Sequence, residues 1–186
     1  MYNTREEWLV AAIESLRPLF NDSGSEDFGA PRVSLGFSAG GSARKTAGTC
    51  WSKDASADGT NEIFISPLLE NTTGANGILA VLVHELCHAS GHMDHKKGFR
   101  RLALAVGLTG KMTSTIAGPQ LCARIENIAD SLGAYPGAPL TMQDRKKQTT
   151  RMIKMQCDSC GFVARASRSA ISQAGFPTCG CGGAMA

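Results

Sequence analysis

All four histidines of the chain, His84, His88, His92 and His95, lie within twelve consecutive residues. His84 and His88 are four residues apart, so on a helix their rings leave the same face and can share one metal ion. Glu85 follows His84 directly, in the H-E-x-x-H order whose glutamate acts as a general base. The cluster therefore predicts a helix that carries a catalytic zinc, with His84 and His88 as ligands and Glu85 taking a proton from the attacking water.

The residues before the cluster predict that this helix runs from about Gly74 to His88. Apolar side chains recur at helical spacing on the side opposite the two histidines: Ile78, Leu79, Leu82, Val83 and Leu86. One face of the helix can then be buried against a sheet, while the other presents the imidazoles to a cleft. Two histidines in an ordinary core helix would not need a glutamate beside them, so the catalytic interpretation is preferred.

The third zinc ligand is not decided by spacing alone. If the helix continued, His95 would lie about 10 Å along the axis from His88. One zinc ion cannot bridge that distance with bonds of about 2.0–2.1 Å, so the helix must break, and Gly91 is a suitable terminator. His95, His92 and Asp94 then all remain possible. Asp94 occupies the position of the third ligand in the metzincin spacing H-E-x-x-H-x-x-G-x-x-H.

Four of the seven cysteines form two close pairs in the last 30 residues: Cys157 with Cys160, and Cys179 with Cys181. An odd total and close pairs are typical of reduced thiols rather than of a disulfide framework. Two such pairs can close a tetrahedral site with no position left for substrate, which predicts a structural zinc. Apolar residues are few here, so metal binding would supply much of the folding free energy.

The other elements predict an α+β fold. Alternation and helical periodicity, with caps and breakers, predict helices and strands in this order: a helix from Thr4 to Pro18, a strand over 33–37, a glycine-rich turn at 38–42, strands at 48–52 and 62–66, and helices at 96–106 and 119–132. A small sheet packed on the H-E-x-x-H helix is therefore expected. We expect the strand at 62–66 to be an edge that holds an extended substrate, with Trp51 and Phe64 lining the cleft.

The segment 134–139 has the composition of a linker and predicts two domains, residues 1–140 and 141–186. From residue 143 to the end, seven lysines or arginines stand against two aspartates. A basic module favours a polyanionic partner such as DNA, although a solvated surface would have the same composition. Apolar runs are well short of the roughly 20 residues that cross a bilayer, and the N-terminus is polar and acidic. A cytoplasmic protein without a membrane partner is expected.

These residues resemble the SprT-like family of zinc metallopeptidases, which includes the Spartan proteases. The family's H-E-x-x-H is matched by residues 84–88, and its H-G-x-x-F by residues 95–99, with Lys96 in place of the glycine. Residues 48–51 and 62–66 look like the family's two strands before the active-site helix. Residues 107–113 look like small SprT-like proteins of bacteria and bacteriophages.

The resemblance implies a zincin-like metallopeptidase domain followed by a zinc ribbon, with His95 as the third ligand of the catalytic zinc. It further implies an endopeptidase that cleaves proteins or peptides, including proteins attached to nucleic acid. Two alternatives stay open. One is a nucleic-acid-binding adaptor with two structural zinc ions and vestigial or no hydrolase activity, against which the retained Glu85 argues. The other is a zinc hydrolase of non-peptide substrates.

Overall fold

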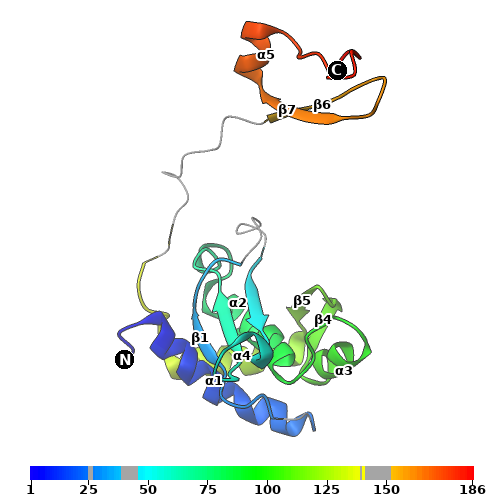
Figure 1. Ribbon diagram of the computed structural model, residues 1–186. Coiled ribbons are helices and arrows are strands. Elements are labelled where there is room, and N and C mark those ends of the chain that lie inside the picture. Colours follow the sequence, from blue (N-terminus) through cyan, green and yellow to red (C-terminus); the bar gives the residue numbers. More distant parts are fainter. Residues whose placement is uncertain (25–26, 39–45, 139, 141–151) are drawn as a thin grey trace. The chain divides into compact units, whose positions relative to one another are not determined.

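The computed structural model describes residues 1–24, 27–38, 46–138, 140 and 152–186 (Figure 1). The chain divides into two compact units, Met1–Thr141 and Met142–Ala186. Most of the glycine-rich turn predicted at 38–42 lies outside the described residues. The same holds for the lysines and arginines between 143 and 151, which belong to the basic module predicted to favour a polyanionic partner. Among the described residues, no helix is long and apolar enough to span a membrane.

Helix α1 (Arg5–Asp22) begins where the sequence predicts. Thr4 caps it, and the Glu7 side chain completes a capping box. The predicted end at Pro18 is wrong, because the helix continues for another turn. Leu19 and Phe20 in that turn are buried in the core, and their packing outweighs the backbone hydrogen bond that proline cannot donate.

Three short strands form a mixed sheet in the first unit: β1 (Arg32–Leu35), β2 (Gly48–Trp51) and β3 (Glu62–Ile65). Their order is β1-β3-β2, with β3 parallel to β1 and antiparallel to β2. The prediction of an edge strand at 62–66 is therefore wrong. β3 is central, and β2 is an edge of the sheet among the described residues. Ile63 and Ile65 are fully buried on the face that packs against helices.

The H-E-x-x-H helix is α2 (Glu70–Ala89), which packs against the sheet and against the two later helices. Gly74 has a non-helical conformation, so the regular helix starts just after it, as predicted. At the other end Gly91, with a φ of 91°, donates its amide to the His88 carbonyl. A short helix η1 (Lys53–Ala55) links β2 to β3.

Two helices and a hairpin complete the first unit. They are α3 (Lys97–Ala105), β4 (Leu108–Lys111), β5 (Ser114–Ala117) and α4 (Pro119–Leu132). In Figure 1 the hairpin β4–β5 lies on the other side of α2 from β1. The core joins α1, the sheet, α2, α3 and α4 into one cluster of buried side chains.

The first residues of the segment predicted as a linker pack against α1. Tyr135 makes an edge-to-face contact with Trp8 at 5.1 Å between ring centroids, and the Trp8 indole donates to the Gly133 carbonyl. Arg5 donates to the Pro136 carbonyl at 3.0 Å and pairs with Glu70 at the start of α2. The chain is thus held against the first unit for several residues after α4.

The second unit consists of an antiparallel hairpin, β6 (Met152–Gln156) and β7 (Val163–Ser167), followed by α5 (Arg168–Ala174). The C-terminal residues return beside the hairpin through an isolated bridge between Cys157 and Met185. Its buried core is small and consists of Met155, Cys157 and Met185. The described chain is therefore of mixed α+β composition with small sheets, as predicted.

Candidate active site and metal centres

Three histidine rings converge at the C-terminal half of α2. His84 and His88 project from one face of the helix, and His95 reaches them from the segment just before α3. Their ligand nitrogens all lie within 4.8 Å of one another, and the Nε2 atoms of His84 and His95 are 3.3 Å apart. Two nitrogens bound to one tetrahedral zinc at about 2.0–2.1 Å are separated by about 3.3 Å. The histidine trio, His84, His88 and His95, therefore fits a single zinc ion.

The other nitrogens of two of these rings have hydrogen-bond acceptors. The Nδ1 of His88 lies 2.6 Å from the His92 carbonyl oxygen, and the Nδ1 of His84 lies 2.8 Å from the Thr115 hydroxyl. A proton on each Nδ1 satisfies both contacts and leaves both Nε2 lone pairs free to bind metal. His92 thus contributes its backbone rather than its ring.

Asp94, the other alternative for a third ligand, is engaged elsewhere. One carboxylate oxygen accepts the Lys96 amide at 3.0 Å, and the other lies 3.4 Å from the Lys96 ammonium group. These contacts hold the side chain at the start of α3. Among the described residues, the group of possible metal ligands that contains His84 and His88 includes His95 but neither Asp94 nor His92.

Phe99 forms the floor beneath the trio. Its ring is fully buried, lies 4.5 Å from the His88 ring at an interplanar angle of 29°, and lies 4.9 Å from each of the other two rings. Burial and the neighbouring imidazoles lower the pKa of His84 to about 3, and burial also lowers the pKa of His88. The two rings are therefore neutral at neutral pH, which is the form that binds a metal.

Glu85 lies between α2 and β2 and is only 4% exposed. Burial raises its pKa to about 8, while the backbone amide of Cys50 donates to the carboxylate and offsets part of that rise. Gly48 makes room for it, because a Cβ at that position would lie 2.7 Å from Glu85 Oε1 and 2.7 Å from Val81 Cγ1. Gly48 is a site residue that sequence reasoning missed, since a glycine at the start of a strand has no signal of its own.

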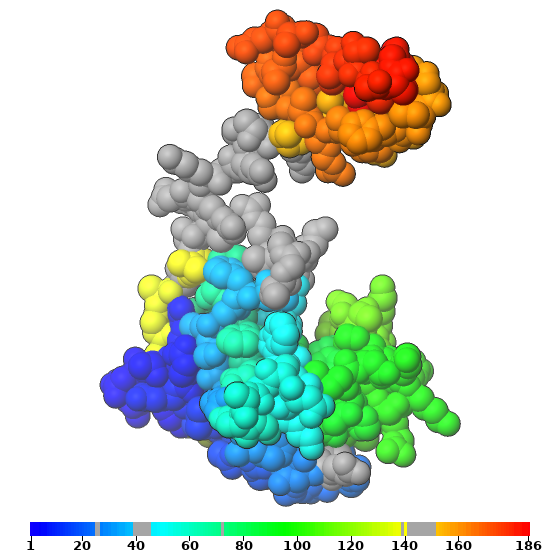
Figure 2. Space-filling model, in the orientation of Figure 1, coloured from blue at the N-terminus to red at the C-terminus, as the bar shows by residue number. Residues whose placement is uncertain are grey.

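A cleft of about 580 Å³ lies over the trio and Glu85. One wall is residues 46–50, which include β2, and the other is residues 113–117, which include β5. In Figure 2 the cyan surface of β2 and the green surface of the hairpin stand on either side of a notch. Apart from Glu85, the described residues that line the cleft carry neither a carboxylate nor an ammonium or guanidinium group. The hairpin wall was also missed by sequence reasoning.

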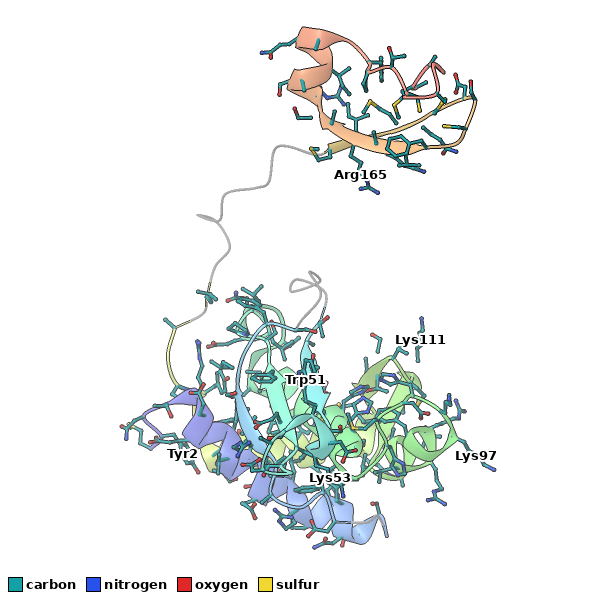
Figure 3. The ribbon with its side chains drawn as sticks, viewed as in Figure 1. Tyr2, Trp51, Lys53, Lys97, Lys111 and Arg165 are labelled. Atoms are coloured by element: carbon teal, nitrogen blue, oxygen red, sulfur yellow. The ribbon has the colours of Figure 1, made fainter. Side chains whose placement is uncertain are left out.

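Trp51 and Phe64 do not line this cleft, so that prediction is wrong. They belong to a separate hollow with Phe37, and Trp51 is 44% exposed there (Figure 3). Side chains alternate along a strand, so Trp51 leaves the face of β2 opposite to Gly48 and Cys50. The aromatic side chains therefore point away from the metal helix.

The second unit brings its four cysteines together. Cys157 and Cys181 have sulfurs 3.5 Å apart, those of Cys160 and Cys179 are 3.6 Å apart, and all four lie within 4.8 Å. These distances are too long for disulfides and close to the separation of about 3.8 Å expected for thiolates on one tetrahedral zinc. Backbone amides of Cys160 and Ser159 lower the pKa of Cys157 to about 6, which favours the thiolate.

Backbone turns shape both halves of this cysteine site. Gly161 and Gly182 both have positive φ, at 74° and 84°, and each closes a turn by donating its amide to the carbonyl of Cys157 or Cys179. Gly183 leaves room for a ligand, because a Cβ there would lie 2.6 Å from the sulfur of Cys157. The closed group of four thiols is consistent with a structural zinc.

Two comparisons with known proteins found a similarity to one family. The sequence profile of the SprT-like family matches residues 13–118. The chain is also similar to the protein SprT-like of Staphylococcus carnosus (strain TM300), at 29% identity over 105 residues. That alignment covers 55% of this chain and 66% of the relative, a little under two thirds of its length. No solved structure matched significantly. The profile match includes the trio, Glu85 and both walls of the cleft, and excludes the cysteine site.

Proposed function

The chain belongs to the SprT-like family, and from this premise we propose that it is a zinc-dependent endopeptidase with a zincin-like catalytic domain. His84, His88 and His95 would hold the catalytic zinc, and Glu85 would be the general base. The observation that carries the proposal is the convergence of three imidazoles and one buried glutamate side chain on a single cleft. Residues 1–140 form the catalytic domain in this proposal, and residues 141–186 form a ribbon around a second, structural zinc held by Cys157, Cys160, Cys179 and Cys181.

A zinc ion held there would supply Lewis acidity, polarising a peptide carbonyl and acidifying water. The chain supplies the rest. Burial favours the protonated form of Glu85, and the positive charge of a zinc ion held by the trio would favour its ionised form. In that form the carboxylate, fixed by the Cys50 amide and pressed against Gly48, takes a proton from the attacking water. It then passes that proton to the leaving amine nitrogen, so the base is restored. Phe99 keeps the underside of the site dry.

β2 supports a peptide substrate rather than a small molecule. Among the described residues it pairs with a strand on one side only, and its residues line the cleft. An extended chain can therefore add to its free edge through backbone hydrogen bonds. Met93 and Ile116, which are 44% and 65% exposed, lie along the same cleft and offer apolar contacts to substrate side chains.

The distribution of cations supports action on proteins associated with nucleic acid. Within the first unit, four arginines each bond a carboxylate: Arg5, Arg17, Arg32 and Arg124. Arg100 and Arg101 on α3 are exposed, and neither forms an ion pair within the described part of the chain. Lys97 and Lys111 extend from one and the same side of the first unit in Figure 3. Exposed cations without a carboxylate partner attract polyanions.

The peptidase proposal is tested with Glu85→Gln and a matched control, Glu126→Gln, which changes an exposed glutamate on α4. Wild type and the control should degrade an unfolded protein such as casein, and Glu85→Gln should not, while all three retain about two zinc ions per chain. Equal activity in Glu85→Gln and wild type would reject the proposal.

The nucleic-acid adaptor is the alternative, and the unpaired cations favour it equally. It predicts tight nucleic-acid binding without proteolysis by the wild type. The cationic surface is tested in either case by the salt dependence of binding to duplex DNA. Replacing Arg100 and Arg101 together by glutamine should reduce the slope of log K against log salt by about 1.8, whereas Arg124→Gln should leave it unchanged. An unchanged slope in the double variant would exclude these two side chains from the contact.

A further inference from the structure

Thr115 supports a metal ligand from outside the metal helix. Its hydroxyl lies 2.8 Å from the Nδ1 of His84, a ring whose other nitrogen faces His95. The corresponding support for His88 is a backbone carbonyl, which no substitution removes. Thr115 is therefore the one side chain, among the described residues, whose hydroxyl bonds to the trio.

The register of the β4–β5 hairpin aims this hydroxyl at the trio. Thr115 pairs with Gly110, and Ala117 pairs with Leu108, which is fully buried. Thr115 and Ala117 are half-buried, whereas Ser114 and Ile116 between them are exposed. A slip of one residue would turn Thr115 to the other face of the hairpin and place Ser114 or Ile116 at His84.

The hairpin is anchored at its turn as well as at its base. Met112, in the connection between the strands, is only 9% exposed and packs in the main core. Leu108 and Ala117 hold the opposite end. Because the hairpin that carries Thr115 is fixed at both ends, the hydroxyl loses little conformational entropy when it bonds to His84. The hydrogen bond is therefore preorganised.

We infer that Thr115 is a positioning residue for the catalytic metal, an inference that rests on the proposed function. Its hydroxyl can accept the Nδ1 proton of His84, and in that arrangement it holds the rotation of the ring in the tautomer that metal binding requires. Nε2 then keeps its lone pair and its direction toward the position shared with His88 and His95. Because β5 is also a wall of the cleft, the same strand forms the substrate site and holds a metal ligand.

The test measures zinc affinity in the full-length protein by competition with a chelator. Thr115→Val removes the hydroxyl at nearly constant volume, Thr115→Ser restores it, and Ser114→Ala removes an exposed hydroxyl from the neighbouring residue as a matched control. Thr115→Val should weaken zinc binding at the histidine site by about 10–100-fold, the usual effect of losing such a partner. Thr115→Ser and Ser114→Ala should stay near wild type.

The cysteine site serves as an internal reference in each protein. Cobalt(II) distinguishes the two sites, since only the cysteine site gives sulfur-to-metal charge-transfer bands, and those bands should not change. Equal affinity of Thr115→Val and wild type would overturn the inference, and so would equal weakening in Thr115→Val and Thr115→Ser. Zinc affinity is measured without substrate. A wild type that binds zinc but cleaves nothing would reject the proposed function alone, whereas one that binds no zinc at the histidines would reject both.

Discussion

Replacing Gly48 by alanine should disable Glu85 without removing zinc. The added Cβ would lie 2.7 Å from Glu85 Oε1, 2.7 Å from Val81 Cγ1 and 2.9 Å from Glu85 Cγ. Comfortable contacts between such atoms are about 3.5–4.0 Å, so an overlap of about 1 Å must be relieved. Val81 and Glu85 both stand on α2, but the β-branched Val81 side chain has one strongly preferred rotamer in a helix, whereas the longer Glu85 side chain can rotate, so we expect Glu85 to move.

The expected loss follows from that displacement. A shift of about 1 Å in a catalytic group costs about 10²-fold in rate, so kcat should fall by about that factor. Overpacking typically costs about 1–3 kcal/mol, and each kcal/mol lowers the melting temperature of a protein this size by about 2–4 °C. The three atoms nearest to the added methyl group belong to Glu85 and Val81 and not to the trio, so the zinc content should not change.

The assay combines casein hydrolysis, zinc analysis and thermal denaturation of Gly48→Ala and of Glu126→Gln. Glu126 is exposed on α4 and belongs neither to the cleft lining nor to a ligand group, so Glu126→Gln is the control. It should behave as wild type in all three measurements. A Gly48→Ala variant with kcat within twofold of wild type would refute the reasoning, since the carboxylate would then not lie against β2 during the reaction.

Three other substitutions have clear expected outcomes. Phe99→Ala should lower the free energy of unfolding by about 3–5 kcal/mol in urea titrations and weaken zinc binding in a chelator competition, because the trio loses its floor. Cys160→Ser should open residues 152–186 to limited proteolysis and leave the first unit intact by mass spectrometry, because the second unit has a small core. Trp8→Ala should also cost about 3–5 kcal/mol in urea, whereas Val10→Ala, at a neighbouring position that is 53% exposed, should cost little.

Local signals in the sequence were sufficient for several elements. Proline at the first position and Gly133 after the last predict α4 at 119–132, and the structure has it there. Gly91 ends the H-E-x-x-H helix as its residue type suggests. In each case neighbouring residues determine the backbone conformation, so no knowledge of the tertiary structure is needed.

Features that depend on distant packing could not be predicted. Pro18 looks like a helix terminator until the burial of Phe20 is known. The residues of a single strand do not determine which strands lie beside it in the sheet. The central strand β3 could therefore be mistaken for an edge strand. The hairpin β4–β5 has strands of only four residues with no apolar alternation, and its importance arises from Thr115, which meets His84 across 31 positions of sequence.

The two candidate metal sites differ in what holds their ligands in place: packing with distant residues at the histidine trio, and the metal itself at the cysteine group. The histidine trio is carried by α2, whose apolar face lies in the main core, and its rings are held by Phe99 and by acceptors from other elements. Its geometry therefore does not need the metal to form, and one side of it faces an open cleft. The cysteine group is carried by the second unit, whose described residues have a buried core of only three side chains, so the metal itself must contribute much of the order there. A chelator should consequently strip the first site reversibly but unfold the second unit, which is the division of labour expected of a catalytic and a structural zinc.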